Sequence, residues 1–254
     1  MRLFVSALAL LAASGPTLAQ DPAEDWDLTV NAERQLTLAT LDFGDNILAL
    51  RCQAGTLDLL LTGVPVSTGA LRTARVTIGA VANEEQVWAA RPGQPVIGAD
   101  EPARLARQLR AGGDLDLRLQ PEPGTEGVRR YRLTAPASAA AVDAVLTACG
   151  EPLDEPRDLL VRVPLEPAPT WLIQPRPIWP AAATAGEGAV EVSCVVSPDW
   201  GLADCRAEGE APAGQGFAAA ALASTAAARI APPADGTDVR GRILRFTVRL
   251  NRPS

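Results

Sequence analysis

Histidine and lysine are both absent from this chain of 254 residues, so all 23 basic side chains are arginine. Without histidine, the chain has no Ser-His-Asp or Cys-His catalysis, no histidine metal ligand and no histidine pH sensor. The 30 acidic residues give a net charge of −7 at pH 7. Proteins that bind nucleic acid instead carry a basic patch or stripe, so we expect no nucleic-acid partner.

Catalytic and cofactor motifs are lacking as well. Gly-x-Gly occurs only at residues 186–188 and 214–216, and neither follows a predicted strand, as a dinucleotide-binding loop would. The adjacent acids Glu84 and Glu85 fit the solvated end of a strand better than a catalytic pair. The cysteines have no Cys-x-x-Cys spacing, which argues against a metal site. We therefore expect no enzyme activity, no cofactor and no metal.

Long apolar runs are lacking after the N-terminus. Met1–Ala19 has the order of a signal peptide, with Arg2 before the apolar run Leu3–Ala13 and a small residue at its end. An uncleaved membrane anchor is the alternative, but a span needs about 20 apolar residues, and Ser14–Pro16 end the run earlier. We expect cleavage, export to the periplasm and no membrane span in the mature chain.

The C-terminal part, residues 175–254, is predicted to contain two strands, one helix and a last strand. Val190–Val196, Leu202–Glu208 and Arg242–Leu250 alternate apolar and polar residues, as strands with one wet face do. Gln215–Ile230 is rich in alanine, the residue with the highest helix propensity. On the last strand, the residues predicted to face the core are Leu244, Phe246, Val248 and Leu250.

Four cysteines in an exported chain indicate two disulfides. If Ser197 lies opposite Leu202 across a four-residue turn, Cys194 falls opposite Cys205, and opposed side chains are close enough for a bridge. The alternative is that these two cysteines are unpaired small apolar residues. The expected bridges are Cys52–Cys149 and Cys194–Cys205.

Residues 20–150 are predicted to form a mostly β domain with two helices, Glu101–Ala111 and Ser138–Cys149. Leu57–Leu59 and Leu115–Leu119 show the clearest alternation of apolar and polar residues. The predicted strands are Gln35–Phe43, Ile47–Cys52, Thr56–Thr62, Leu71–Gly79, Glu85–Ala90, Asp114–Leu119 and Val128–Thr134. Many short strands with two helices suggest a β-sandwich or a rolled sheet. The expected fold class of the whole chain is α+β.

Residues 151–174 are predicted to link the two domains. Prolines recur through this segment from Pro152 to Pro169, and proline at such density favours an extended, semi-rigid spacer. The apolar run Leu159–Val163 leaves open that part of the linker docks as a strand. We expect two independently folding units on either side of it.

Six features of the C-terminal part occur in the order seen in a known family. They are Pro177–Pro180, Val190–Val192, Gly201, Gly214–Leu222, Arg229–Pro233 and Arg245–Leu250. This set resembles the C-terminal domain of TonB, the energy transducer of Gram-negative envelopes, and covers about the last third of the chain. The resemblance implies a small ββαβ domain.

The resemblance to TonB implies a binding module that recruits a segment of an outer-membrane receptor by strand addition. The partner-binding edge would be the last strand, whose predicted outward residues are Ile243, Arg245, Thr247 and Arg249. The cleaved N-terminus and the short linker depart from TonB, so the alternative is a periplasmic structural or assembly protein without energy transduction. The sequence leaves a homodimer open.

The N-terminal part has a resemblance of its own. Leu50–Cys52, Arg130–Leu133 and Ala148–Gly150 are similar to segments of small exported proteins of the invasion-associated type. Those proteins are compact β-sandwiches, and the resemblance implies no active site. It therefore bears on the expected fold of residues 20–150 and not on their role.

Overall fold

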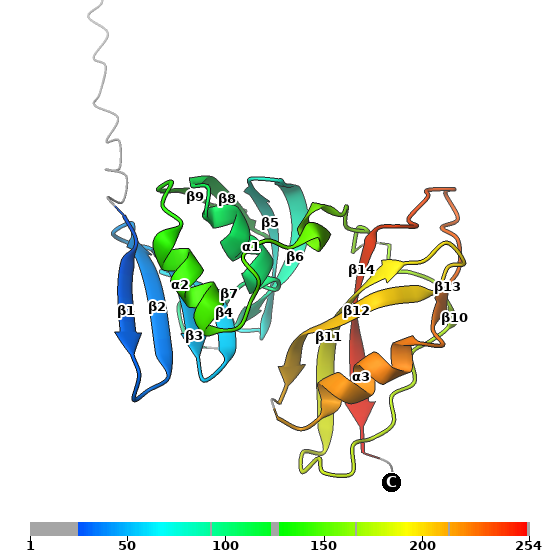
Figure 1. Ribbon diagram of the computed structural model, residues 1–254. Coiled ribbons are helices and arrows are strands. Elements are labelled where there is room, and N and C mark those ends of the chain that lie inside the picture. Colours follow the sequence, from blue (N-terminus) through cyan, green and yellow to red (C-terminus); the bar gives the residue numbers. More distant parts are fainter. Residues whose placement is uncertain (1–24, 92, 123–126, 166, 213, 253–254) are drawn as a thin grey trace, which may run out of the picture.

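The computed structural model describes residues 25–91, 93–122, 127–165, 167–212 and 214–252. The predicted signal peptide, Met1–Ala19, lies outside these residues. The chain forms an α+β structure with two sheet-based domains next to each other, and the short 3₁₀ helix η1 (Pro156–Leu159) lies between them (Figure 1). The hydrophobic clusters are separate, one drawn from residues 26–153 and two from residues 163–250.

The N-terminal domain is built on one nine-stranded sheet in which all paired strands are antiparallel. Its spatial order is β1-β2-β3-β4-β7-β6-β5-β8-β9. The strands are β1 (Asp27–Asn31), β2 (Leu36–Asp42), β3 (Ile47–Gln53), β4 (Thr56–Thr62), β5 (Leu71–Ile78), β6 (Val81–Ala90), β7 (Val96–Gly98), β8 (Gly113–Leu119) and β9 (Arg129–Ala135). A sandwich needs two stacked sheets, so the sandwich is corrected, and one continuous sheet fits the alternative of a rolled sheet.

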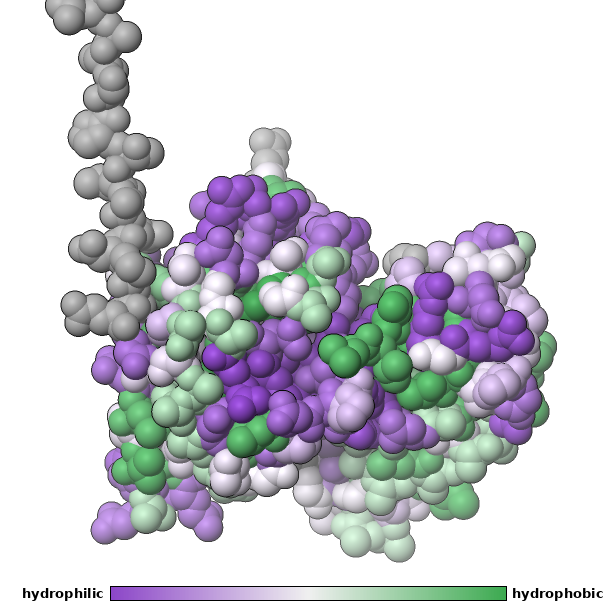
Figure 2. All heavy atoms as spheres, turned by 45° about the horizontal axis from the view of Figure 1, so that its top comes forward, coloured by the Kyte–Doolittle hydropathy of each residue, from purple (hydrophilic) through white to green (hydrophobic). Residues whose placement is uncertain are grey.

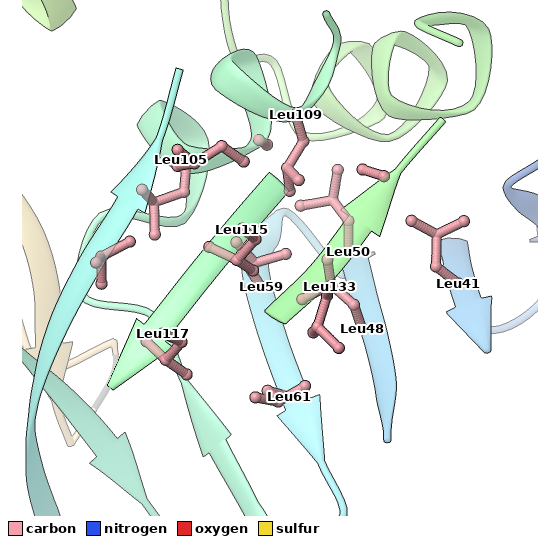
Figure 3. Packing of buried hydrophobic residues seen from close by; sticks show 14 of the residues in the cluster. Leu41, Leu48, Leu50, Leu59, Leu61, Leu105, Leu109, Leu115, Leu117 and Leu133 are labelled. Atoms are coloured by element: carbon pink, nitrogen blue, oxygen red, sulfur yellow. The ribbon is translucent and has the colours of Figure 1, made fainter. Parts of the chain in front are cut away.

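The core of this domain joins both ends of the sheet with two helices, α1 (Pro102–Leu109) and α2 (Ala140–Ala148). Leu50 of β3 and Leu133 of β9 belong to the same cluster although their strands are far apart in the sheet order, so the sheet curves around its core (Figure 3). A disulfide joins Cys52 on β3 to Cys149 at the end of α2. This is the expected pair.

The C-terminal domain has the predicted strand, strand, helix, strand order. The strands β11 (Glu187–Val196), β12 (Leu202–Ala211) and β14 (Ile243–Asn251) form a sheet with the order β12-β11-β14. Helix α3 (Phe217–Thr225) packs on β11 and β12 and buries Phe217 and Ala221 against them. A separate pair, β10 (Trp171–Ile173) and β13 (Arg229–Ile230), lies beside this sheet (Figure 1).

The β11–β12 hairpin starts one residue away from the predicted register. Val196, not Ser197, lies opposite Leu202. A bulge then shifts the register by one residue, so that Ser193 lies opposite Arg206, and Asp204 at this bulge has a φ of 43°. Cys194 and Cys205 are thereby brought together with Cα atoms 4.1 Å apart and form the second expected disulfide. The pair was predicted, but the bulge that aligns it was not.

The linker is docked as structure and does not act as an extended spacer. Arg157 and Asp158 of η1 are buried, and so is Arg162. Arg162 forms a parallel bridge with Ile243 of β14, and β10 pairs with β13. The alternative in which Leu159–Val163 docks onto a sheet is therefore the one that the structure adopts, through Val161–Val163.

Candidate strand-binding edge

Strand β14 is the edge strand that was predicted to receive a partner. On one side it pairs with β11 along its length. On its other side, the N–H of Ile243 donates to the carbonyl oxygen of Val161 at 2.9 Å, and the N–H of Val163 donates to the carbonyl oxygen of Ile243 at 2.8 Å. The backbone of Ile243 therefore points away from β11, and this edge already holds a short segment of the same chain.

The remainder of this edge carries backbone groups without a neighbouring strand. Because backbone groups alternate in direction along a strand, the N–H and C=O of Arg245, Thr247 and Arg249 point the same way as those of Ile243. Among the described residues, only β11 and the segment Val161–Val163 pair with β14. The outer edge from Thr247 onward, where the outward side chains are exposed, is thus open to strand addition.

Only half of the predicted partner-binding residues are exposed. Thr247 and Arg249 face solvent, and the Thr247 hydroxyl donates to the carboxylate of Glu191 at 2.5 Å. Ile243 and Arg245 were predicted to face outward, but their exposed fractions are 0% and 8%. The docked linker covers Ile243, and the N-terminal domain covers Arg245. The candidate edge is therefore shorter than the sequence predicted.

Arg245 is the main contact of β14 with the N-terminal domain. Its guanidinium bonds to the carboxylate of Asp100 and donates to the carbonyl oxygen of Glu85 at 3.0 Å. Glu101 lies 3.8 Å from the same guanidinium. The arginine that was expected to meet a partner protein is thus used inside the molecule.

Glu101 is the centre of a buried charge cluster at this contact. It accepts hydrogen bonds from Arg104 at 3.0 Å and from Arg162 at 2.9 Å, and its exposed fraction is 5%. Burial would raise the pKa of Glu101, but Arg162, Arg104 and Arg245 outweigh burial and hold its pKa below the usual value. This carboxylate is therefore ionised and joins the first helix, the linker and β14.

Asp100 and Glu208 behave in the opposite way. Burial raises the pKa of Asp100 to about 7, against the lowering effect of Arg245, and the nearby acids Glu101, Glu191 and Glu208 raise it further. Burial also raises the pKa of Glu208, against the hydrogen bond from Ser193. Burial is the largest cause of both shifts, so the pKa values of these two carboxyl groups lie above those of exposed acids.

A second group of contacts holds η1 against the hairpin. The guanidinium of Arg157 reaches the carboxylate of Asp204 at 2.8 Å and the hydroxyl of Ser193 at 2.7 Å. Arg206 pairs with Glu155 at 2.7 Å. The bulge at Asp204 thus serves the contact between the linker and the sheet as well as the disulfide. The linker covers the polar face of the sheet at this end. The C-terminal half of β14, with Thr247 and Arg249, stays accessible.

A cleft of about 510 Å³ lies beside the linker, between it and the turn that joins β5 to β6. Its apolar wall includes Leu159 and Val161, with exposed fractions of 76% and 62%. Its polar wall includes Glu84, Glu85 and Arg104. Figure 2 shows apolar surface near the boundary between the domains.

Sequence reasoning did not single out Asp100, Glu101 or Arg162. One signal was present in the linker, where Arg162 interrupts the apolar run Leu159–Val163. A charge within an apolar run that docks on a sheet needs a buried partner. Nothing local identifies Asp100 and Glu101 as that partner, because they lie about 60 residues away along the chain.

Comparison with protein-family models, with curated proteins and with solved structures finds no match for this chain. No helix in the described part of the chain is long and apolar enough to cross a membrane. The described residues contain no group of three or more His, Cys, Asp or Glu side chains placed to hold a metal ion. The two disulfides fit an exported protein, since such bonds persist in oxidising compartments.

Proposed function

We propose that the C-terminal domain binds an extended segment of another envelope protein by strand addition along the outer edge of β14. The observation that carries this proposal is the pairing of Val161–Val163 with Ile243. The edge accepts an added strand within the chain itself, and its next residues present the same backbone groups without a partner strand. Main-chain hydrogen bonds would supply the affinity, and alternate side chains the selectivity.

The kind of partner follows from the resemblance to the C-terminal domain of TonB. That resemblance favours an outer-membrane receptor, in support of transport across that membrane. Arg249 is the exposed basic residue on the open part of the edge, so a partner segment with an acidic residue opposite it would bind more tightly at low salt. Arg245 contributes no such attraction, because its charge is used by Asp100.

The test compares two substitutions at one position. Thr247→Pro removes an N–H that points away from β11, while Thr247→Ala keeps that N–H and removes only the side chain. Immobilised wild-type and variant proteins would be incubated with an outer-membrane extract, and the bound proteins identified. We expect Thr247→Pro to recover about tenfold less receptor, the loss of about one or two hydrogen bonds, and Thr247→Ala to bind as wild type. Equal recovery by both variants would exclude this edge.

A second candidate function is a periplasmic structural or assembly protein that uses the same fold without energy transduction. The docked linker favours it, because the buried ion pair Glu101–Arg162 holds the linker on the N-terminal domain, whereas a transducer that spans the periplasm needs a long spacer. Sequencing the mature N-terminus separates the two. A start near Gln20 removes the membrane anchor that force transmission needs, and an intact Met1 restores it.

A further inference from the structure

Strand β1 forms one edge of the large sheet and, among the residues that the structure describes, pairs with β2 alone. All but one of its five residues are exposed. Leu28 and Val30 have exposed fractions of 46% and 65%. The strand is nevertheless held in place, because Trp26, directly before it, is buried in the core of the N-terminal domain. An anchored edge strand with exposed apolar side chains is a template for pairing with another strand.

Leu28 and Val30 lie on the core face of the sheet. Leu28 is opposite Ala39, which is opposite Leu50, which is opposite Leu59, and the last three are buried in the core. Directly opposed residues share a face. Helix α2 packs on β2 and β3, so the cover that it gives ends before β1. Leu28 and Val30 therefore extend the core face of the sheet beyond the helix that covers it, and both side chains remain partly exposed.

We infer that β1 is the docking surface for β1 of a second copy of this chain, with the two strands antiparallel and Thr29 on the twofold axis. In this register Leu28 of each copy lies opposite Val30 of the other, so both apolar side chains are covered. On the other face, Thr29 meets its own copy and Asp27 meets Asn31. Apolar pairs and Thr–Thr pairs are favourable across antiparallel strands. The two large sheets would join into one.

The sequence of β1 selects this register and this partner. Asp27 is its only charged residue, and a parallel, in-register pair would place the two Asp27 carboxylates opposite each other, which is destabilising. The antiparallel pair places an amide opposite each carboxylate instead. The opposite edge of the same sheet, β9, carries Arg129, Arg130 and Arg132, and such charges protect an edge from pairing. The protein blocks one edge of this sheet and leaves the other apolar.

Sedimentation equilibrium on the purified chain tests the association. Wild type is compared with Val30→Lys and with Leu71→Lys, a control at an apolar residue of β5 with a matching exposed fraction of 64%. We expect a monomer–dimer equilibrium with a dissociation constant between about 5 and about 500 µM, as for a small interface. Val30→Lys should weaken it more than about tenfold, because twofold symmetry places each substitution in the interface twice, and Leu71→Lys should leave it unchanged.

A cysteine at the symmetry axis tests the register. Thr29→Cys places two thiols directly opposite each other, close enough for a disulfide between copies, while the four native cysteines are already bonded. We expect a covalent dimer after mild oxidation, and much less of it for Val128→Cys, an exposed control outside β1. A wild-type chain that stays monomeric at every concentration overturns the inference. So does a dimer that persists in Val30→Lys, or equal cross-linking of the two cysteine variants.

Discussion

The two domains bury their sheets with different kinds of helix. The N-terminal domain covers its sheet with leucines and valines from both helices, such as Leu105, Leu109 and Leu146, in one large cluster. The C-terminal domain covers its sheet with an alanine-rich helix in which Phe217 is the one large buried side chain among the described residues of α3. Methyl groups let helix and sheet approach closely, but they bury little apolar area.

The difference indicates that stability is spread over many residues in the first domain and concentrated at a few in the second. The small clusters of the second domain are supported by aromatic contacts, Trp179 with Phe217 and Trp171 with Phe246. They are also supported by the buried ion pairs that Arg245 and Arg162 make with the first domain. Four experiments sharpen or break this comparison.

The disulfides should give the largest effects. Replacing Cys52 and Cys149 with alanine opens a loop with a sequence separation of 97, and loop-closure entropy predicts a loss of about 4–5 kcal/mol. For Cys194 and Cys205 the separation is 11, and the prediction is about 3 kcal/mol. Urea unfolding of each double variant measures both losses. A larger loss of unfolding free energy at the hairpin would mean that the Cys194–Cys205 bond stabilises the domain by more than the closure of its own loop.

Phe217→Ala should cost about 3–5 kcal/mol, as for large buried aromatic side chains, and should unfold the second domain alone. Hydrogen exchange resolved by domain would show faster exchange in β11, β12 and β14 and unchanged exchange in β2 and β3. Leu222→Ala on the same helix is the control, because Leu222 is only partly buried. If both substitutions destabilised the domain equally, its core would not depend mainly on the Phe217 ring.

The contact between the domains should weaken as pH rises. Burial lifts the pKa of Asp100 from 3.8 to about 7, so its stabilising contribution is complete below pH 3.8 and is lost as pH rises through about 7. Between pH 5 and pH 8 the free energy of unfolding should fall by about 2–4 kcal/mol, and Asp100→Asn should remove most of this dependence. An equal slope in the variant would assign the effect to other groups, among which Glu208 has the same sign.

Gly188→Ala should give the smallest loss. Gly188 of β11 lies under Phe217, and an added Cβ would run into the ring, so overpacking should cost about 1–3 kcal/mol. Gly186→Ala is the matched control, since an added Cβ there meets open space. Thermal unfolding of both variants measures the difference. A neutral Gly188→Ala would show that the ring has room to move, against a tightly filled core.

Local pattern was enough to predict most strands, all three helices and both cysteine pairs. Strand β4 was predicted with the observed bounds, Thr56–Thr62, because its side chains alternate between the core and solvent. Short strands without such a pattern were missed, as for β7. The predicted helix Gln215–Ile230 was too long, because α3 ends at Thr225 and Arg229–Ile230 form β13. These strands form because they pair with segments that are distant along the chain. Hydrophobic periodicity and strand propensity are local properties and do not reveal such pairing.

On β14, the alternation of apolar and polar residues predicted the exposure of some side chains correctly and of others wrongly. Alternation correctly placed Val248 in the core and Thr247 in solvent. It placed Arg245 in solvent as well, because arginine usually faces water, whereas the buried Asp100 holds it inside the molecule. The same limit applies to the large sheet, where nothing local distinguishes one curved sheet from two stacked ones. Contacts between domains and between distant strands supplied this part of the structure.

The pairing of the cysteines has a consequence for how the chain is made. The first cysteine bonds to the second and the third to the fourth, so a chain that emerges N-terminus first meets each native partner before the next cysteine arrives. Oxidation in order of emergence therefore yields the native bonds directly, without the slow reshuffling that crossed pairings require. The first domain can close its bridge while the second is still being delivered, which suits a protein whose domains fold one after the other.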